Sequence, residues 1–402
     1  MRHPLSGRGN TSMFTTSHKA IGSGWRRADG RIGLRNHVIA FSTVALTDRI
    51  TALAAGRVDG VLPLCPAFQR GLRGADATLQ AETIQAVIDH PNVGAALVVT
   101  HDRAAAEKLR ADCMGLGKPV VVLSLIAGAG IQNANDAMVK HLQDLKAAVA
   151  DSPKTPLHLS DLVVALECGG SDATSALAAN PAIGRFVDRV ISAGGTSIVS
   201  ETAEFLGGED VIRSQSHNEA VAKDILGYLR IEEQMMQNDG IDYRGVNPTP
   251  ENIEAGLSTL TEKTMGAVCK IGSSRFAGAL SFAERPQSAG LYFMHTPFFS
   301  PTSLTGMVLA GAQISLFAMG VYNPSGMPLA PTLKICGNPQ TLSDWPDGID
   351  LDVSGIITGS SDYDDAADSI RNLIAEIADG KLTRAEEWQE GQIIVPVSQL
   401  PL

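Results

Sequence analysis

The sequence predicts an α/β fold of two Rossmann-like units, each with a mostly parallel sheet flanked by helices. Apolar runs of strand length alternate with segments of helical periodicity, which is typical of parallel sheets covered by helices. The alternation starts again after a linker-like SPKTP stretch at 152–156, and 402 residues suffice for such a division. We therefore expect a flexible N-terminal tail at 1–23, a first α/β domain at 24–155 and a second at 156–402 with a CGGSD signature.

The first unit is predicted to alternate four strands with four helices. The apolar run HVIAFSTVA at 37–45 opens it, and the next helix runs through Ile50 and Leu53. The other strands are expected at 58–65, 93–100 and 118–125, and the other helices at 77–90, 104–113 and 132–150.

The second unit is predicted to open with a strand at 159–167. A helix should follow at 180–194, with Asn180 as its cap and Pro181 at its first position. The segment 217–237 is predicted to be the longest helix, followed by a loop at 240–252. Further strands are expected at 196–201, 291–296, 314–320, 331–337 and 354–359, and a last amphipathic helix at 364–379.

Charge and cysteine usage narrow the function. The net charge is −11 and no long basic run occurs, which argues against nucleic-acid or anionic-membrane binding. The five cysteines are widely spaced without a CxxC pair, as in proteins of a reducing compartment, so we expect a cytoplasmic protein. No stretch of 18 apolar residues could span a bilayer. The composition is that of a globular enzyme.

The segment LECGGSDATSALAANPAIG at 166–184 is the most informative part of the chain. It places small polar groups where a buried strand ends, and ligands bind at that edge in open α/β folds. The alternative is a tight strand-to-helix turn with Asp172 or Thr174 as the cap, and the two readings stay open here. The groups in question are Cys168, Gly169, Gly170, Ser171 and Asp172.

Two further segments carry groups suited to anions. RADGRIGLRNH at 27–37 is rich in arginine, which holds a carboxylate bidentately, although a loop with a structural arginine pair is the alternative. KIGSSRFAG at 270–278 is a Gly/Ser turn that could cradle a carboxylate, with Lys270 as charge or base. The chain lacks a Walker motif, a G-x-G-x-x-G after the first strand and a G-x-S-x-G elbow. No nucleotide cofactor is therefore expected.

Glu201 and His295 each follow an apolar strand. A carboxylate in that position commonly has a metal or a cation as its partner, and a histidine there is well placed to transfer protons. A lone histidine is more often structural.

Taken together, these segments resemble the large catalytic region of the altronate/galactarate dehydratase family, over roughly residues 24–360. The motifs that carry the resemblance are RADGRIGLRNHV, CGGSDATSALAANPAIG, GGTSIVSETAEFLG (194–207), the stretch 251–280 and the stretch 290–317.

The resemblance implies a carbon–oxygen lyase that removes water from a sugar acid or small hydroxy acid and yields a 2-keto-3-deoxy acid. It implies a divalent metal, Fe²⁺ with Mn²⁺ as the alternative, and a homodimer. The family's small domain either precedes this region or is a separate subunit, so a small-domain partner subunit and a chain that works without one both stay open. The expected metal ligands are Cys65, Cys168 and Glu201, and the expected catalytic residues are His295, Lys270 and Glu201. The expected substrate-binding residues are Arg27, Arg35, Asn36, Gly169, Gly170, Ser171, Asp172, Ser273 and Ser274.

Departures from the family pattern keep alternatives open. The stretch THDRAAAE at 100–107 and the region around Met327 lack expected cysteines, and His295 stands where an aspartate is expected. Because soft cysteine ligands are missing, the identity of the metal stays open. Because an acid/base residue differs, the identity of the substrate stays open. The alternatives are a lyase that eliminates another group, such as sulfite from sulfolactate, and a non-catalytic paralogue that binds a sugar acid.

Overall fold

The computed structural model describes residues 19–240, 248–399 and 401, and it confirms the predicted fold class. The first unit is a four-stranded parallel sheet of order β4-β3-β5-β6. Its strands are β3 (His37–Ser42), β4 (Val61–Leu64), β5 (Val93–Thr100) and β6 (Val120–Ser124). Its helices are α1 (Ala45–Ala55), α2 (Gly74–Asp89), α3 (Arg103–Asp112) and α4 (Ile131–Val149).

The second unit is a seven-stranded sheet, parallel throughout, of order β10-β11-β9-β8-β12-β13-β14. Its strands are β8 (Val163–Gly169), β9 (Thr196–Val199), β10 (Phe276–Leu280), β11 (Gly290–Met294), β12 (Ile314–Met319), β13 (Thr332–Cys336) and β14 (Leu351–Asp352). Its longer helices are α5 (Asn180–Ser192), α7 (Glu219–Asp239), α9 (Leu260–Val268), α10 (Ser300–Leu309) and α13 (Tyr363–Ala378). The shorter ones are α6 (Glu209–Ser214), α8 (Pro250–Glu254), α11 (Pro339–Asp344), α12 (Gly355–Thr358) and α14 (Arg384–Glu387).

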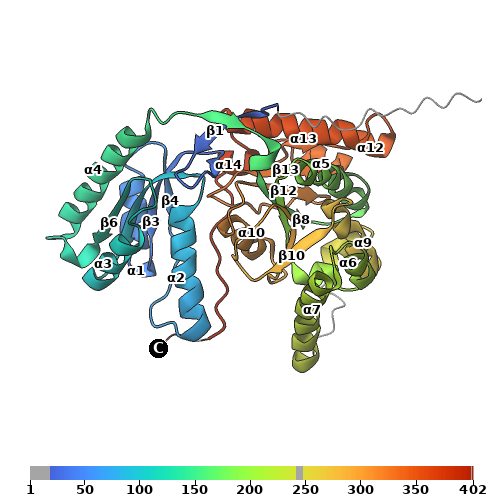
Figure 1. Cartoon of the computed structure of the whole chain (residues 1–402), viewed down its shortest axis with the longest axis horizontal. Coiled ribbons are helices and arrows are strands. Elements are labelled where there is room, and N and C mark those ends of the chain that lie inside the picture. Colours follow the sequence, from blue (N-terminus) through green and yellow to red (C-terminus); the bar gives the residue numbers. More distant parts are fainter. Residues whose placement is uncertain (1–18, 241–247, 400, 402) are drawn as a thin grey trace, which may run out of the picture.

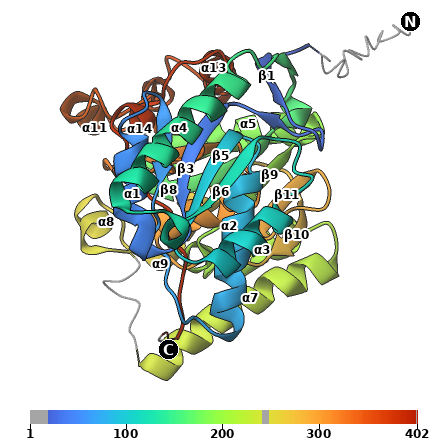
Figure 2. The same ribbon diagram turned by 90° about the vertical axis from the view of Figure 1, so that its left-hand side faces the viewer.

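The two sheets share one middle layer. Phe41 of the first sheet and Phe317 of the second belong to the same buried cluster, to which α2 and α10 also contribute (Figure 1). Helices α1 and α4 cover the outer face of the first sheet, as Figure 2 shows. The C-terminal segment runs along the same layer, because the Ser398 N–H donates to Asp76 on α2 (3.1 Å) and the Ile394 N–H to Thr305 on α10 (3.1 Å).

A small antiparallel sheet joins the start of the chain to the junction between the units. It has the order β2-β1-β7, formed by β1 (Gly22–Arg26), β2 (Ile32–Gly33) and β7 (Thr155–Leu157). Gly22 and Ser23 therefore belong to a strand and not to the predicted tail, because their backbone pairs with β7. Residues 1–18 of that tail lie outside the described residues.

Most predicted elements form, with three corrections. The segment 354–359 is the helical turn α12 and not a strand, because β14 already occupies that edge of the sheet. Asn180 does not cap α5, since a π-helical turn at Ser175–Ala179 runs directly into the helix. Of the predicted loop at 240–252, residues 250–252 begin α8 and 241–247 lie outside the described residues. Helix α7, with 21 residues, is the longest one described, as predicted.

None of the described helices combines the length and apolarity needed to cross a membrane.

Candidate active site

Five ionisable side chains meet in the interior of the second unit. They come from the end of β8, from the turn after β9 and from the turn before β10. Each is at most 3% exposed, so water contributes little to their solvation. Burial of several ionisable groups in one place is costly unless they pair or stay neutral, and such clusters are typical of functional sites. The five are Glu167, Cys168, Glu201, Glu204 and Lys270.

Lys270 and Glu204 form the charged half of this cluster. The Lys270 ammonium pairs with the Glu204 carboxylate and donates to the Cys168 Sγ at 3.0 Å. The Cys168 thiol in turn donates to Glu204 Oε1 at 3.0 Å. Burial and the neighbouring Glu204 raise the pKa of Cys168 well above its usual value, so the thiol is protonated. Burial by itself lowers the pKa of Lys270, but the negative charge of Glu204 outweighs burial, so the pKa lies above its usual value and the ammonium persists.

Glu167 and Glu201 form the second half, a hydrogen-bonded pair of carboxyl groups. Burial raises the pKa of Glu167 to about 7, and burial together with Glu167 raises that of Glu201 well above its usual value. Like-charged carboxylates in contact share a proton, so the pair titrates as a unit. Ser303 on α10 donates to Glu167 Oε2 and also contacts the Ser200 hydroxyl.

The backbone at Glu201 is strained. Its φ of 63° lies in the left-handed region, which costs a residue with a Cβ roughly 1–2 kcal/mol. The Glu201 N–H donates to Thr296 Oγ1 at 2.9 Å, which ties the turn after β9 to the end of β11. Strain of this kind persists only where the surrounding structure imposes it, and such positions gather at functional sites.

His295 lies beside the cluster and not within it. Its Nδ1 is 2.7 Å from Thr202 Oγ1, and its ring stacks on Tyr228 of α7 with 4.6 Å between centroids. Thr202 follows Glu201 directly in the chain, so the Thr202 side chain connects His295 to the residue next to the carboxyl pair. Burial lowers the pKa of His295, which keeps the imidazole neutral near neutral pH.

The turn after β8 is a tight structural turn. Asp172 accepts from the Ser175 N–H (2.8 Å), the Thr174 hydroxyl (2.7 Å) and the Asn338 amide at the end of β13 (2.8 Å). Gly170 has a φ of 65°, and a Cβ there would lie 2.1 Å from the Val321 carbonyl oxygen. The alternative of a turn with Asp172 as the cap therefore describes residues 170–172, while Cys168, just before it, belongs to the buried cluster.

Arg27, Arg35 and Asn36 bind protein groups at the amino edge of the first sheet. All five N–H groups of the Arg35 guanidinium are used, by Glu386 twice and by the carbonyls of Leu34, Ile377 and Lys381. Arg27 donates to Asn36 Oδ1 (2.8 Å) and to the carbonyls of Pro91 (2.6 Å) and Arg35 (3.0 Å). The N–H groups of Arg35 are thus all bound to protein groups, which gives this side chain a structural role, while substrate binding by Arg27 and Asn36 stays a prediction.

Ser273 and Ser274 hold a carboxylate, as the Gly/Ser turn led us to expect, but it belongs to the protein. The Ser273 N–H (2.9 Å) and hydroxyl (2.9 Å) and the Ser274 hydroxyl (2.7 Å) all donate to Asp188 on α5. The turn therefore fixes α5 to the start of β10. Substrate binding by the two serines stays a prediction.

The expected metal ligands do not come together. Cys65 lies after β4 of the first unit, where its Sγ donates to the Asp48 carbonyl at 3.4 Å, while Cys168 and Glu201 lie in the second unit. Within the described part of the chain, no three His, Cys, Asp or Glu side chains are grouped so that they could hold a metal ion. The Lys270 ammonium also lies against Cys168 and Glu204. The predicted ligand set therefore does not fit a metal in this arrangement.

Models of known protein families match almost the whole chain. Residues 24–150 match the second domain of D-galactarate dehydratase/altronate hydrolase, and residues 159–400 match the C-terminal region of D-galactarate/altronate dehydratase. The chain belongs to the D-galactarate/altronate dehydratase family. The resemblance inferred from the sequence motifs is thereby confirmed.

Individual members of the D-galactarate/altronate dehydratase family are similar over most of the chain. One is the (2R)-sulfolactate sulfo-lyase subunit beta of Chromohalobacter salexigens, 30% identical over 90% of this chain and 94% of the relative. The altronate dehydratase of Escherichia coli is 29% identical over 89% of this chain and 74% of the relative. The galactarate dehydratase (L-threo-forming) of Escherichia coli is 28% identical over 91% of this chain and 74% of the relative.

The sequence analysis missed Glu167, Glu204 and Ser303. Glu167 had a usable signal, because it is a charged residue inside an otherwise apolar strand and must therefore find a partner in the core. Glu204 lies three residues after Glu201 in a short helical turn, Thr202–Phe205, which brings both carboxyls toward the end of β8. Ser303 had no such signal, since only the packing of α10 on β8 places its hydroxyl against Glu167.

Proposed function

We propose that this chain is the catalytic chain of a lyase that acts on a small hydroxy acid or sugar acid. The observation that supports it most is the buried cluster of Glu167, Cys168, Glu201, Glu204 and Lys270, in a chain whose relatives are named as dehydratases and a sulfo-lyase. An elimination needs one group that takes a proton and another that gives one, close together and shielded from water. The carboxyl pair of Glu167 and Glu201 has this character.

The proposed elimination conserves the protons of the pair. The ionised carboxylate takes the proton from C2 of the substrate, the C3–O bond breaks, and the protonated carboxyl gives its proton to the leaving hydroxide, which departs as water. The enol that remains rearranges to a 2-keto-3-deoxy acid. Lys270 cannot be the resting base, because its ammonium is engaged by Glu204. It is a positioning residue that neutralises Glu204 and orients Cys168.

The test is a comparison of two isosteric variants. Glu201→Gln removes the acid/base function from the pair, and Glu232→Gln changes another buried carboxyl of the same unit, on α7. We expect Glu201→Gln to lower kcat for 2-keto-acid release by roughly 10²–10⁴-fold, and Glu232→Gln to leave it near the parent value. Full activity of Glu201→Gln would contradict the proposed role. Failure of the unaltered chain, both alone and with its small partner, to release product from any aldonate, aldarate or sulfolactate would favour the binding paralogue.

Sulfite is a second possible leaving group, supported by the similarity to the sulfolactate sulfo-lyase subunit. The same pair would take the C2 proton of sulfolactate while the C3–S bond breaks, and the enol product would become pyruvate. Release of sulfite together with a stoichiometric 2-keto acid would identify this reaction. Release of the keto acid alone would identify dehydration.

A divalent metal, Fe²⁺ or Mn²⁺, stays a prediction. When bound, such an ion would polarise the substrate carboxylate and acidify the C2 proton. Metal analysis of protein purified without oxygen tests it directly. Binding of Fe²⁺ near one equivalent, lost in Cys168→Ala and retained in Cys65→Ala, would place the ion in the second unit.

We further propose a partner subunit and a homodimer. Support for a partner is that one relative is itself named as a subunit. Co-purification with a candidate small-domain protein, followed by a mass measurement in solution, tests both proposals. A cytoplasmic location stays a prediction that accords with five free cysteines.

A further inference from the structure

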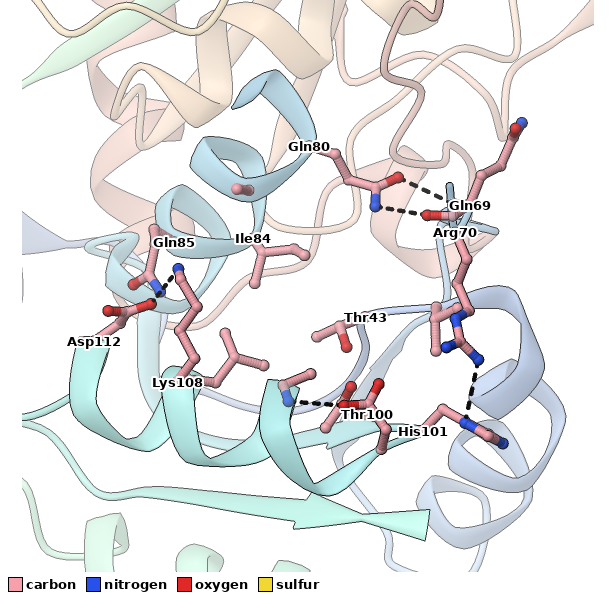
Figure 3. Close-up of a pocket in the computed structure, with 15 residues that line it drawn as sticks. Thr43, Gln69, Arg70, Gln80, Ile84, Gln85, Thr100, His101, Lys108 and Asp112 are labelled. Atoms are coloured by element: carbon pink, nitrogen blue, oxygen red, sulfur yellow. Dashed lines mark hydrogen bonds and ion pairs between the residues drawn. The ribbon is translucent and has the colours of Figure 1, made fainter. Parts of the chain in front are cut away.

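The first unit has a cavity of about 220 Å³ at the carboxyl edge of its sheet (Figure 3). In the order β4-β3-β5-β6, the chain places β4 on one side of β3 and then β5 and β6 on the other side. Open α/β sheets bind ligands in the crevice at this switch in strand order, which here lies between β3 and β5. The cavity lies in this crevice. Thr43 and Val44 line it from the end of β3, and Thr100, His101 and Asp102 line it from the end of β5.

Among the described residues around the cavity, one cationic side chain has no carboxylate partner. The Asp102 carboxylate accepts from the Ala105 N–H (2.9 Å) and caps α3, and Lys108 pairs with Asp112 (2.9 Å). Arg70 approaches His101, with 3.5 Å between Nη1 and Nδ1, and among the described residues it forms no ion pair. Figure 3 shows the Arg70 side chain extending toward His101 at the edge of the cavity.

The loop that carries Arg70 is held in place. The Gln80 amide of α2 donates to the Gln69 carbonyl at 2.9 Å and accepts from the Gln69 N–H at 3.0 Å. A guanidinium on a fixed loop loses less conformational entropy when it binds an anion than one on a free loop does.

The floor of the cavity offers one further donor, the hydroxyl of Thr100. Thr100 lines the same floor at 3% exposure, and within the described structure no residue bonds its hydroxyl.

We propose that this cavity is a second ligand site, separate from the buried cluster, and that it binds a small oxyanion. The shared chemistry is that of a carboxylate on a small organic acid or of free phosphate. Arg70 and the Thr100 hydroxyl are the donors. The volume suits a small ion or acid and lies below the roughly 300–1,000 Å³ of pockets for drug-sized ligands.

The experiment measures binding of inorganic phosphate and, separately, of malate to the full chain by calorimetry, at low and high salt. We expect saturable binding of at least one of them, weakened by salt. Arg70→Gln should weaken it about 10–100-fold, because a charge-assisted hydrogen bond is lost. Arg73→Gln is the matched control, since Arg73 is an exposed arginine of the same loop that does not line the cavity.

A second variant tests whether the anion binds in the cavity itself and not elsewhere on the surface. Ala105→Met fills the cavity from α3 without changing charge, and it too should abolish binding. The phosphate and malate arms distinguish free phosphate from an organic acid. Absence of binding by the unaltered chain, or binding that survives both Arg70→Gln and Ala105→Met, would overturn the proposal. Equal losses in Arg70→Gln and Arg73→Gln would do so as well, because they would indicate diffuse surface attraction.

Discussion

The carboxyl edges of the two sheets have the same topological position and opposite character. In the first unit the edge is an open cavity, bordered by exposed Arg70 and half-buried His101. In the second unit the corresponding edge is filled by Glu167, Cys168 and their partners, none more than 3% exposed. Solvation makes the difference: water screens charges in the first site, while in the second each charge must be matched by a protein group. The first edge is suited to reversible binding and the second to proton transfer.

The largest expected effect comes from breaking the ion pair of the second edge. Lys270→Met leaves the Glu204 carboxylate buried without its cation, so we expect the free energy of unfolding to fall by about 3–5 kcal/mol. Urea unfolding of the purified variant measures it. Lys270→Met combined with Glu204→Leu should be less destabilised than Lys270→Met alone, because no unpaired charge remains. A double variant that is no better would show that packing, not charge, dominates this cluster.

A smaller effect is expected where the C-terminal region binds the amino edge of the first sheet. Arg35→Lys keeps the charge but loses the planar fork that contacts Glu386 and three carbonyls. We expect a loss of about 2 kcal/mol in the free energy of unfolding, again from urea titration. Arg26→Lys, a change at an exposed arginine of β1, is the control and should leave the unfolding midpoint nearly unchanged. A stable Arg35→Lys variant would return Arg35 to the candidates for substrate binding.

The smallest effect is a difference in pH dependence between the two units. His90 of the first unit donates from Nε2 to the Ala312 carbonyl (3.1 Å) and accepts at Nδ1 from the Asn92 N–H (3.1 Å). Burial lowers its pKa well below 6.5, so the unfolded chain takes up its proton first as the pH falls. Stability from His90 is therefore present above about pH 6.5 and is lost in more acidic solution.

Glu201 responds in the opposite sense. Burial raises its pKa well above 4.5, so the folded chain keeps a proton that the unfolded chain releases, and stability falls as the pH rises above about 4.5. Between its pKa values in the folded and unfolded chain, each group changes the free energy of unfolding by at most about 1.4 kcal/mol per pH unit. Unfolding curves from pH 5 to 7.5 should show that His90→Gln makes the slope of stability against pH less positive and Glu201→Gln makes it more positive. Slopes that change in the same direction would contradict this contrast.

The sequence predicted the fold well where strands are buried on both faces. Strand β5 was predicted without error at 93–100, because all eight of its residues are buried and its sequence is a continuous apolar run. Strand β10 (FAGAL) was missed, since a short strand with a central glycine has little pattern of its own. The segment 354–359 was predicted as a strand from two isoleucines, although Ile357 is exposed and no neighbouring strand was free to pair.

The candidate site was predicted in part. Cys168, Glu201 and Lys270 were chosen because each lies at the end of an apolar run or in a Gly/Ser turn, and the structure brings all three together. The contacts of Arg35 were not predicted, because its partner Glu386 is 351 residues away in the chain. The contacts of Ser273 were not predicted for the same kind of reason, since the carboxylate that it binds comes from Asp188 on another element. Roles in active-site chemistry still await the experiments above.

The sequence by itself determined the alternation of strands and helices, the family, and which polar residues lie at strand ends, because these depend on local periodicity and short motifs. Only the tertiary structure decided which of those residues meet. Lys270 binds Glu204, Arg35 contacts the C-terminal region, and Cys65 lies in a different unit from Cys168. The physical reason is that pairing and burial depend on contacts between distant segments, and burial sets the solvation that decides which groups carry charge.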